Sequence, residues 1–414
     1  MKKKLFLSMV VAMLALAFVG FYSTPANAIY QEISETSTYD STTGLVKVET
    51  VVQFGCKEIN RFVMGRVVKA DSQGQPLPAT QLKGAFILLP PGGSNSAVYD
   101  IASPDSLVNF LALNGVDVYT YSPRTTLLVP GDCAVKDCSP MKRWGISTYI
   151  NDIDYVSLKA FLYHFKRPVL GGLSLGGVLA IAAANRTPWA FEGLVLWEST
   201  LYYGPPSQSY YEGQPLQNHY QQGCADLKTL VESGTYFDEE TYPGLQYIFF
   251  LADIDPEGDS PFYPGLTNMQ FFVVAVTTPG NPPEAEAPGY TTLAGDLFTG
   301  LYYANWDYIR QFLLFGLNYY EPTALQRDYT CGFAGERTFT QNLGLYYGPI
   351  LSLQSGNGFG TYAEDNLALF SNADVTRNLK LGYGHVEHST HFDQYEELQE
   401  PLWQWMEQKV LPNW

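Results

Sequence analysis

The stretch "RPVLGGLSLGGVLAIAAAN", residues 167–185, places a single hydroxyl, Ser174, between a strand-like run and an alanine-rich helical run. Residues 172–176, Gly-Leu-Ser-Leu-Gly, fit the pattern G-x-S-x-G, which forms a tight turn from a strand into a helix. The glycines admit the backbone where a side chain would not fit. The N–H groups of the helix start point to the same place, so they would stabilise developing negative charge. The stretch therefore predicts a nucleophilic serine, with a merely structural Gly-Ser turn as the alternative.

The segments around this turn alternate between strand-like and helix-like patterns. Residues 44–90 are rich in β-branched residues and end in the continuous apolar run "GAFILLPPGG", which is typical of a buried parallel strand. A helix follows at "SPDSLVNFLALNG", with Ser103 as its expected cap and Gly115 at its end. Such alternation predicts right-handed crossovers and a mostly parallel sheet flanked by helices. Further segments in this pattern are "VDVYTYSPR" (strand), "TYINDIDYVSLKAFLYHF" (helix) and "FEGLVLWES" (strand).

The composition changes after Ser199. Residues 200–345 are crowded with tyrosine, proline and glycine, and helical stretches such as "NWDYIRQFLLFGLNYY" interrupt them. The buried-strand pattern then returns at "YYGPILSLQS", and the chain closes with the amphipathic segment "YEELQEPLWQWMEQKVL". We therefore expect a core of residues 29–199 and 346–414, with residues 200–345 inserted as a cap or lid.

The chain begins with three lysines and an uncharged apolar run, and "Ala-Asn-Ala" at residues 26–28 has the form of a signal-peptidase site. Residues 1–28 are therefore predicted to be a cleaved signal peptide, with an uncleaved anchor as the alternative. We expect an exported protein, periplasmic or extracellular, without stable membrane insertion after cleavage.

The formal net charge is −17, and removal of the three signal lysines makes it −20. With no basic stripe to offset it, this charge disfavours nucleic acid as a partner. The sequence gives no indication of the oligomeric state.

Export would permit disulfides among the five cysteines. Cys133 and Cys138 could close a small loop, which would leave Cys224 and Cys331 to tie the insertion to itself; four cysteines allow three connectivities. Cys56, in a strand-like stretch, is expected to be a small buried residue. Zinc binding by the cysteines is disfavoured because the chain has no C-x-x-C pair.

The chain contains, in this order, the G-x-S-x-G turn (residues 172–176, called the elbow below), the inserted segment and a late histidine. In this arrangement most of the chain resembles the α/β-hydrolase superfamily, in particular its capped lipase- and esterase-like members. The resemblance implies a nucleophilic serine, an acid, a histidine and an oxyanion hole. "GYGHVEHSTH" is similar to the G-x-G-H loop that delivers the base, so His385 is the preferred base and His388 the next candidate. His385, His388 and His391 could instead chelate a metal. His164 and His219 are expected to be structural or solvent-facing.

The acid is harder to place. Relatives usually carry it just beyond the strand that "GPILSLQS" represents, but here no carboxylate follows until Glu364 and Asp365. A second location, after the strand that follows the nucleophile's helix, is occupied by Glu198. A buried carboxylate there would need a partner, and an imidazole N–H would satisfy it while fixing the tautomer. Glu198 is the preferred acid and Asp365 the alternative. Glu198 could also have a purely structural role, as a carboxylate at a strand end that pairs with a backbone amide or an arginine.

The resemblance also implies two oxyanion donors. One is the N–H of Leu175, directly after the nucleophile. The other comes from the loop "PPGGSNS", where Gly93 is the best candidate because small residues let the backbone approach the substrate. The aromatic residues of the insertion could roof a pocket for an acyl chain or simply pack on the core. With no obvious cationic cluster, a neutral small-molecule ester is the expected substrate.

The sequence thus favours an exported serine hydrolase that cleaves carboxylic esters through an acyl-enzyme, without cofactor or metal. A peptidase or amidase of the prolyl aminopeptidase-like type is the alternative on the same fold. Its acidic cap residues could lie at 238–240 or 253–259, which could equally be solvated loops. A non-catalytic binding protein is a third reading, disfavoured because serine and histidine are both retained.

Overall fold

The computed structural model describes residues 29–238, 241–277 and 303–414. The predicted signal peptide, residues 1–28, lies outside the described residues. The acidic pair Glu239 and Glu240 of the insertion also lies outside them.

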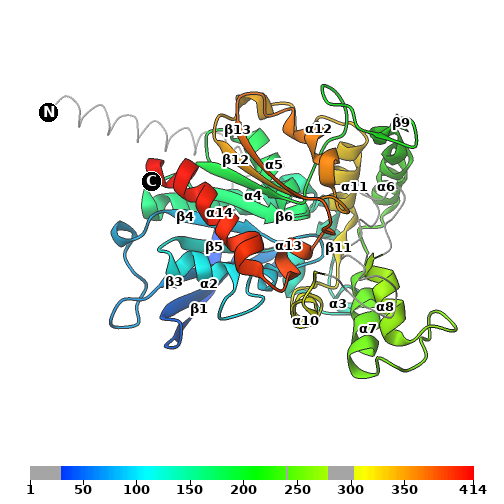
Figure 1. Cartoon of the computed structure of the whole chain (residues 1–414), viewed down its shortest axis with the longest axis horizontal. Coiled ribbons are helices and arrows are strands. Elements are labelled where there is room, and N and C mark those ends of the chain that lie inside the picture. Colours follow the sequence, from blue (N-terminus) through cyan, green and yellow to red (C-terminus); the bar gives the residue numbers. More distant parts are fainter. Residues whose placement is uncertain (1–28, 239–240, 278–302) are drawn as a thin grey trace.

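A nine-stranded sheet forms the centre of the molecule, in the order β1-β2-β3-β5-β4-β6-β7-β12-β13 (Figure 1). The pairs from β5 to β13 are all parallel, whereas β1, β2, β3 and β5 pair antiparallel. The sheet is therefore mostly parallel on the side that carries the elbow. Its strands are β1 (Tyr30–Asp40), β2 (Leu45–Phe54), β3 (Arg61–Lys69), β4 (Ala85–Leu89), β5 (Asp117–Ser122), β6 (Val169–Leu173), β7 (Gly193–Trp197), β12 (Pro349–Ser355) and β13 (Asp374–Lys380).

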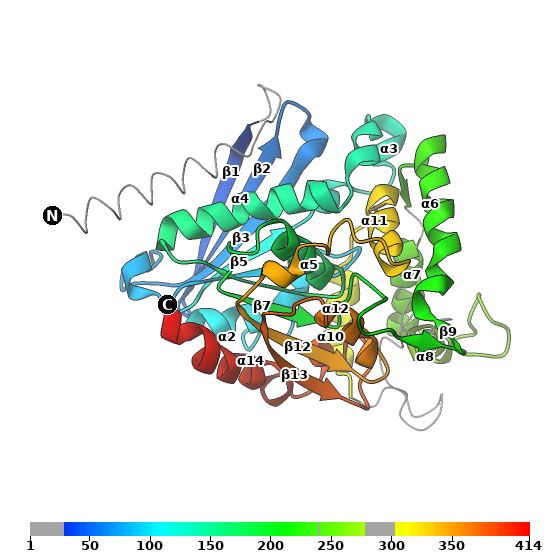
Figure 2. The same cartoon turned by 90° about the horizontal axis from the view of Figure 1, so that it is seen from above.

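Helices cover both faces of this sheet. In Figure 2, α4 and α5 lie on one face, and α2 and α14 lie on the other. The core helices are α2 (Leu107–Leu113), α3 (Asp132–Val135), α4 (Ile146–His164), α5 (Leu175–Arg186), α12 (Glu364–Leu367), α13 (Glu387–Thr390) and α14 (Glu400–Trp405).

Successive side chains of a central strand point to opposite faces of the sheet, so each strand contributes to the two hydrophobic clusters that pack on those faces. In β4, Ile87 and Leu89 pack in the cluster that contains α4 and α5, whereas Phe86 and Leu88 pack in the cluster that contains α2 and α14. A strand with two buried faces reads as a continuous apolar run, which is why "AFILL" shows no polar alternation.

The segment between β7 and β12 lies beyond the carboxyl ends of the parallel strands, at the right of Figure 1. Two short ribbons, β8 (Tyr210–Tyr211) with β9 (Gln214–Pro215) and β10 (Phe237–Asp238) with β11 (Glu321–Pro322), accompany its helices. These helices are α6 (Gln221–Ser233), α7 (Thr241–Ile254), α8 (Asn268–Thr277), α10 (Trp306–Phe315) and α11 (Thr323–Phe333).

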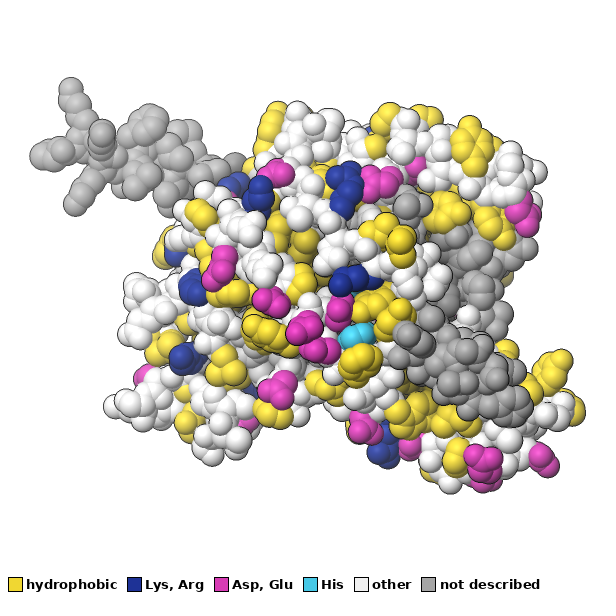
Figure 3. Space-filling view, viewed as in Figure 1, with side chains coloured by type: hydrophobic (Ala, Val, Ile, Leu, Met, Phe, Trp, Pro, Cys, Tyr) yellow, Lys and Arg dark blue, Asp and Glu magenta, His cyan; other side chains and the backbone are white. Residues whose placement is uncertain are grey.

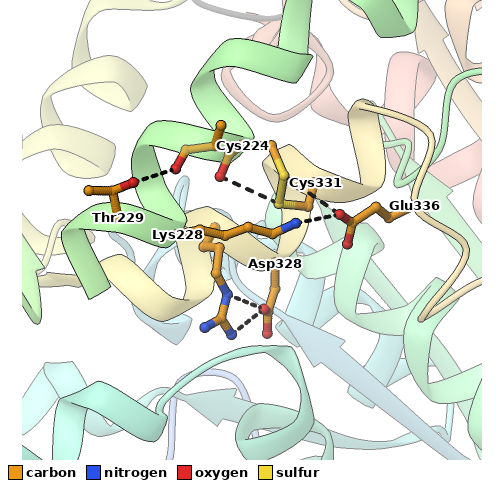
Figure 4. The surroundings of a disulfide bond; sticks show 8 residues. Cys224, Lys228, Thr229, Asp328, Cys331 and Glu336 are labelled. Carbon is orange, nitrogen blue, oxygen red and sulfur yellow. Dashed lines mark hydrogen bonds and ion pairs between the residues drawn. A yellow bond between two sulfur atoms is a disulfide. The ribbon is translucent and has the colours of Figure 1, made fainter. Parts of the chain in front are cut away.

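Two disulfides join Cys133 to Cys138 and Cys224 to Cys331. The second links α6 to α11 within the inserted segment, beside the ion pair between Lys228 and Glu336 (Figure 4). Among the described residues, the group of His, Cys, Asp and Glu side chains close enough to hold a metal is Cys224, Cys331 and Glu336. Because its two sulfurs are bonded to each other, this group is a disulfide site.

The structure corrects several local expectations. The cap of α2 is Ser106, whose Oγ accepts from the N–H of Asn109, and not Ser103. Cys56 follows the end of β2 in a turn and is exposed, so its expected burial is wrong. The sequence reading also missed β1, a strand whose residues are almost all exposed. The closing helix is interrupted by π-helical turns at Tyr395–Gln399 and Met406–Val410.

On the face drawn in Figure 3, Lys and Arg side chains lie scattered among acidic and apolar ones. Among the described residues, none of the helices combines the length and the apolarity that crossing a bilayer requires.

Candidate active site

The elbow places Ser174 at the junction of β6 and α5 with φ 54° and ψ −119°. This backbone conformation is strained for a residue with a side chain, and such strain is concentrated at functional sites. The Ser174 N–H donates to the Trp197 carbonyl (2.8 Å), so the turn stays attached to the neighbouring strand β7. Ser174 itself is partly exposed, whereas β6 before it is buried.

The flanking glycines are required by the close approach of backbone. A Cβ on Gly176 would overlap the Leu89 carbonyl at the end of β4, and a Cβ on Gly172 would lie 2.6 Å from the Gly176 carbonyl carbon. The small residues of G-x-S-x-G therefore let α5 begin directly against the strand ends.

Sequence reasoning missed Tyr99, a buried residue whose hydroxyl contacts the backbone directly before Ser174. Its hydroxyl donates to the Leu89 carbonyl and accepts from the Leu173 N–H (3.0 Å). Burial raises the pKa of Tyr99, so the hydroxyl stays protonated. One buried side chain thus joins the ends of β4 and β6, which carry the two loops of the candidate site.

Glu198 follows β7 directly and is fully buried. Its own backbone has φ 46°, so both strand ends carry a strained residue. The carboxylate accepts from the N–H of Ser355 and from that of Phe359 (2.9 Å). A Cβ on Gly358 would collide with the same carboxylate. Ser355 at the end of β12, together with Gly358 and Phe359 in the loop that follows, thus surrounds the Glu198 carboxylate, and sequence reasoning did not identify these three residues.

His385 lies in the loop after β13 and contacts this carboxylate, with 3.3 Å between its Nδ1 and Glu198 Oε2. The imidazole is buried, and the ring of Phe359 meets it edge-on at 5.2 Å between centroids. The Glu387 carboxylate accepts from the Gly384 N–H, which holds the loop just before the histidine. The loop thus orients Nδ1 toward Glu198 and leaves Nε2 for other contacts.

Asp365, the alternative acid, lies elsewhere. Its carboxylate accepts from the N–H of Gly204 (3.0 Å) and from the N–H and Oγ of Ser209 (3.0 and 2.9 Å). Burial raises the pKa of this carboxyl. Asp365 therefore ties the start of the inserted segment to the core, and it is Glu198 that the structure places against a histidine.

The other histidines have separate environments. His388 is buried with Nε2 3.4 Å from the Gln354 carbonyl oxygen, and His391 Nδ1 accepts from the Asp393 N–H (3.0 Å). His164 contacts Asp117 (2.8 Å), which also binds Arg66, and His219 lies beside the Tyr211 carbonyl (3.3 Å). The suggested chelating trio of His385, His388 and His391 does not form a ligand group within the described residues.

Gly93 and Leu175, the two residues expected to donate to an oxyanion, line the same narrow pocket. Leu175 begins α5, and the first N–H groups of a helix have no acceptor within it. Gly93 has φ 60°, and its carbonyl accepts from the Asn318 N–H (2.5 Å). The Asn318 side chain also donates to the Ser94 carbonyl (2.8 Å), so the inserted segment fixes this loop.

The same pocket contains a group that the sequence reading did not single out. Three tyrosines, Tyr121, Tyr149 and Tyr320, and the carboxyl-bearing Glu321 line it together with the backbone positions above. Nothing in the sequence around Glu321 signals this placement, because β11 is only two residues long and pairs with a strand more than eighty residues earlier in the chain.

Comparison with protein-family models finds no match, and comparison with curated proteins finds none. Among solved structures, the chain is similar to "a putative lipase from Sulfolobus solfataricus", with 17% identity and a TM-score of 0.61 over 93% of this chain and 99% of the other. It is also similar to a highly thermostable carboxyl esterase from Bacillus coagulans, with 13% identity and a TM-score of 0.52 over 91% and 99% of the two chains. At these identities the likeness concerns the fold, and the fold is that of the α/β hydrolases.

Proposed function

We propose that this protein is an exported serine hydrolase that cleaves carboxylic esters, with Ser174, His385 and Glu198 as its triad and residues 200–345 as a cap over the core. The observation that carries the proposal is the buried contact of Glu198 with His385 at the strand edge that also carries the strained Ser174. Three separate segments supply these groups, and His385 comes from the C-terminal part of the chain, far from the other two. The two disulfides and the form of residues 1–28 support export.

Each residue has a role that follows from its surroundings. Glu198 accepts the Nδ1 proton of His385, which leaves Nε2 as a base for the Ser174 hydroxyl. Ser174 Oγ then attacks the ester carbonyl carbon, and its proton passes to Nε2. The N–H groups of Leu175 and Gly93 stabilise the oxyanion, each by roughly 3 kcal/mol. The alcohol leaves with the proton from Nε2, and water, deprotonated by the same nitrogen, hydrolyses the acyl-enzyme.

The test is covalent labelling with a fluorophosphonate probe, which reacts with activated serines. The wild-type protein should be labelled and should hydrolyse p-nitrophenyl esters, whereas Ser174→Ala should lose labelling and at least about 1,000-fold in kcat/KM. Ser199→Ala, at another buried serine near the strand ends, is the control and should retain labelling. Labelling of Ser174→Ala at the wild-type level would falsify the proposal.

A further inference from the structure

The loop that carries His385 leads into a stretch of chain that is attached to the inserted segment. Two backbone hydrogen bonds, of 3.2 and 2.7 Å, join residues 303–305 of the inserted segment to residues 390–392. Between them, Ala304 and His391 form an antiparallel β-bridge. The inserted segment is therefore bound to the backbone a few residues beyond the proposed base.

Side chains extend this attachment to the residues directly before the base. The ring of Tyr303 lies against that of Tyr383, with 4.7 Å between the ring centroids, and Tyr383 is buried two residues before His385. The His391 ring stacks on Tyr383 (5.3 Å) and on Tyr303 (5.9 Å). Aromatic pairs at these separations stabilise one another beyond the area that they bury. The three rings therefore fix the position of Tyr383.

The chain before His385 is also attached to the core. The backbone N–H of Asn357 donates to the Tyr383 carbonyl (2.8 Å), and the Asn357 side-chain amide donates to the Gly382 carbonyl (3.1 Å). Asn357 belongs to the loop after β12, which surrounds the Glu198 carboxylate. The backbone of the histidine loop is thus held by the loop around the proposed acid, whereas its tyrosine ring is held by the inserted segment.

Gly382 lies close to the tyrosine of the inserted segment. A Cβ on Gly382 would lie 2.7 Å from the Tyr303 hydroxyl oxygen and 3.4 Å from the nearest ring carbons. The φ of Gly382 lies outside the left-handed region, so an alanine here would be opposed by this contact and not by backbone strain. The histidine loop and the Tyr303 side chain are therefore fitted to each other.

We infer that Tyr303 is a positioning residue for His385: its ring holds Tyr383, and with it the loop that presents the imidazole to Ser174, so that the inserted segment controls the alignment of the base. This inference rests on the proposed function, because the alignment matters only if His385 takes the proton of Ser174. A catalytic group displaced by about 1 Å can cost about 100-fold in rate. Because Tyr303 acts through Tyr383, its loss should lower kcat more than it raises KM.

Substitutions of Tyr303 test the inference. Tyr303→Ala should lower kcat for a p-nitrophenyl ester by about 10- to 100-fold with little change in KM, and should slow fluorophosphonate labelling of Ser174 by a similar factor. Tyr303→Phe keeps the ring and should retain most of the wild-type kcat. Tyr247→Ala, at an exposed tyrosine of α7, is the control and should keep both activities. Unchanged kcat in Tyr303→Ala, or equal losses in the alanine and phenylalanine variants, would overturn the inference.

A second pair of variants decides the question if Tyr303→Ala does not fold. Gly382→Ala should lower kcat, because its Cβ would displace the Tyr303 ring. Adding Tyr303→Phe removes the hydroxyl that this Cβ would meet, so the double variant should recover part of the lost kcat. Unchanged kcat in Gly382→Ala, or losses that simply add in the double variant, would overturn the inference. A wild-type protein that is not labelled by the fluorophosphonate and hydrolyses no ester would instead overturn the proposed function.

Discussion

At the scale of single residues, the site is defined by two strained positions, Ser174 and Glu198, which follow the adjacent parallel strands β6 and β7. A strained backbone persists only where the surroundings fix it. Here hydrogen bonds from Ser174 to Trp197 and from Glu198 to Leu353 (both 2.8 Å) attach each turn to the next strand. The sheet therefore holds Ser174 and Glu198, the proposed nucleophile and acid, in a fixed relation before any substrate binds.

The first residue-scale prediction concerns the acid. Glu198→Gln should lower kcat by roughly 100- to 10,000-fold with little change in KM, because an amide cannot accept from His385 and from both backbone N–H groups while fixing the productive tautomer. Steady-state kinetics with a p-nitrophenyl ester measures the effect.

Asp365→Asn is the matched control. It removes acceptor capacity from the contacts with Gly204 and Ser209 and should cost about 1–3 kcal/mol of stability, with a much smaller effect on kcat. Equal and mild losses of kcat in the two variants would contradict the assignment of Glu198 as the acid.

The second residue-scale prediction concerns acid stability. Burial lowers the pKa of the His388 imidazole below its ordinary value of 6.5, and the nearby Glu198 carboxylate opposes this only in part. The unfolded chain then binds more protons than the folded one at mildly acidic pH. The stabilisation associated with a neutral His388 is therefore complete above about pH 6.5 and is lost as the pH falls toward the lowered pKa.

Urea unfolding between about pH 8 and pH 5 measures this loss. The free energy of unfolding of the wild type should fall on acidification. His388→Gln keeps a donor for the Gln354 carbonyl but does not titrate, so the free energy of unfolding of this variant should fall less steeply. His391 contributes in the same direction, because burial also lowers its pKa. A difference between wild type and variant that stays constant with pH would contradict the prediction.

At the scale of secondary-structure elements, the start of α5 is tightly constrained by the end of β4. Gly176→Ala should destabilise the protein by about 1–3 kcal/mol, because the new Cβ would meet the Leu89 carbonyl, a backbone atom that cannot rotate away. Activity should fall as well, since Leu89 precedes the loop that carries Gly93.

Gly223→Ala in α6 is the control for helix propensity. A Cβ there would make an ordinary contact of 3.6 Å with Thr330, so this variant should be neutral or gain up to about 1 kcal/mol. Thermal and urea denaturation compare the two variants. Stabilisation by both substitutions would show that the contact at Gly176 does not constrain the elbow.

Elements with strong local signals were predictable from the sequence. The apolar runs of β4, β6, β7 and β12 have two buried faces, so their composition alone marks them. β1 was missed because its residues are almost all exposed. The cap of α2 was misplaced because Ser103 and Ser106 both precede the apolar run, whereas the helix begins at Leu107, directly after Ser106.

The residues of the candidate site also divide into those that a local sequence pattern marks and those that only contacts in the folded chain identify. Ser174 and Gly93 lie in local patterns of glycine, and these patterns are what make them candidates. The sequence favoured Glu198 over Asp365 as the acid. The N–H groups that hold its carboxylate, from Ser355 at the end of β12 and from Phe359 in the loop that follows, make contacts that no local pattern encodes. Tyr99 joins Leu89 to Leu173, and Leu173 is 74 residues away in the chain, so only the folded chain identifies this contact.

At the scale of the whole molecule, the inserted segment and the core share the site. Asn318 of this segment holds the Gly93 loop, and the Asp328 carboxylate in α11 accepts from the Ile146 N–H (2.9 Å) at the start of α4. The disulfide from Cys224 to Cys331 (Figure 4) joins residues separated by 107 positions in the sequence. The loop that it closes includes α7, α8 and α10. Anything that loosens this loop should therefore loosen the proposed oxyanion site at Gly93 before it unfolds the sheet.

The last prediction compares the two disulfides. In the chain-entropy account, a cross-link stabilises by restricting the unfolded chain, and its effect grows with the logarithm of the loop length. Replacing Cys224 and Cys331 with serine should cost about 4–5 kcal/mol, whereas replacing Cys133 and Cys138, which are separated by 5 residues, should cost about 2 kcal/mol. Guanidinium unfolding followed by fluorescence gives both values.

Ester hydrolysis measured across the same guanidinium series adds the functional consequence. In the variant without Cys224 and Cys331, activity should be lost at a lower guanidinium concentration than the fluorescence of the core, because Asn318 lies within the opened loop and holds the Gly93 carbonyl. In the variant without Cys133 and Cys138, activity and core fluorescence should be lost together. Coincident loss in both variants would mean that the inserted segment and the sheet unfold as one unit, and that the long loop does not control the site separately.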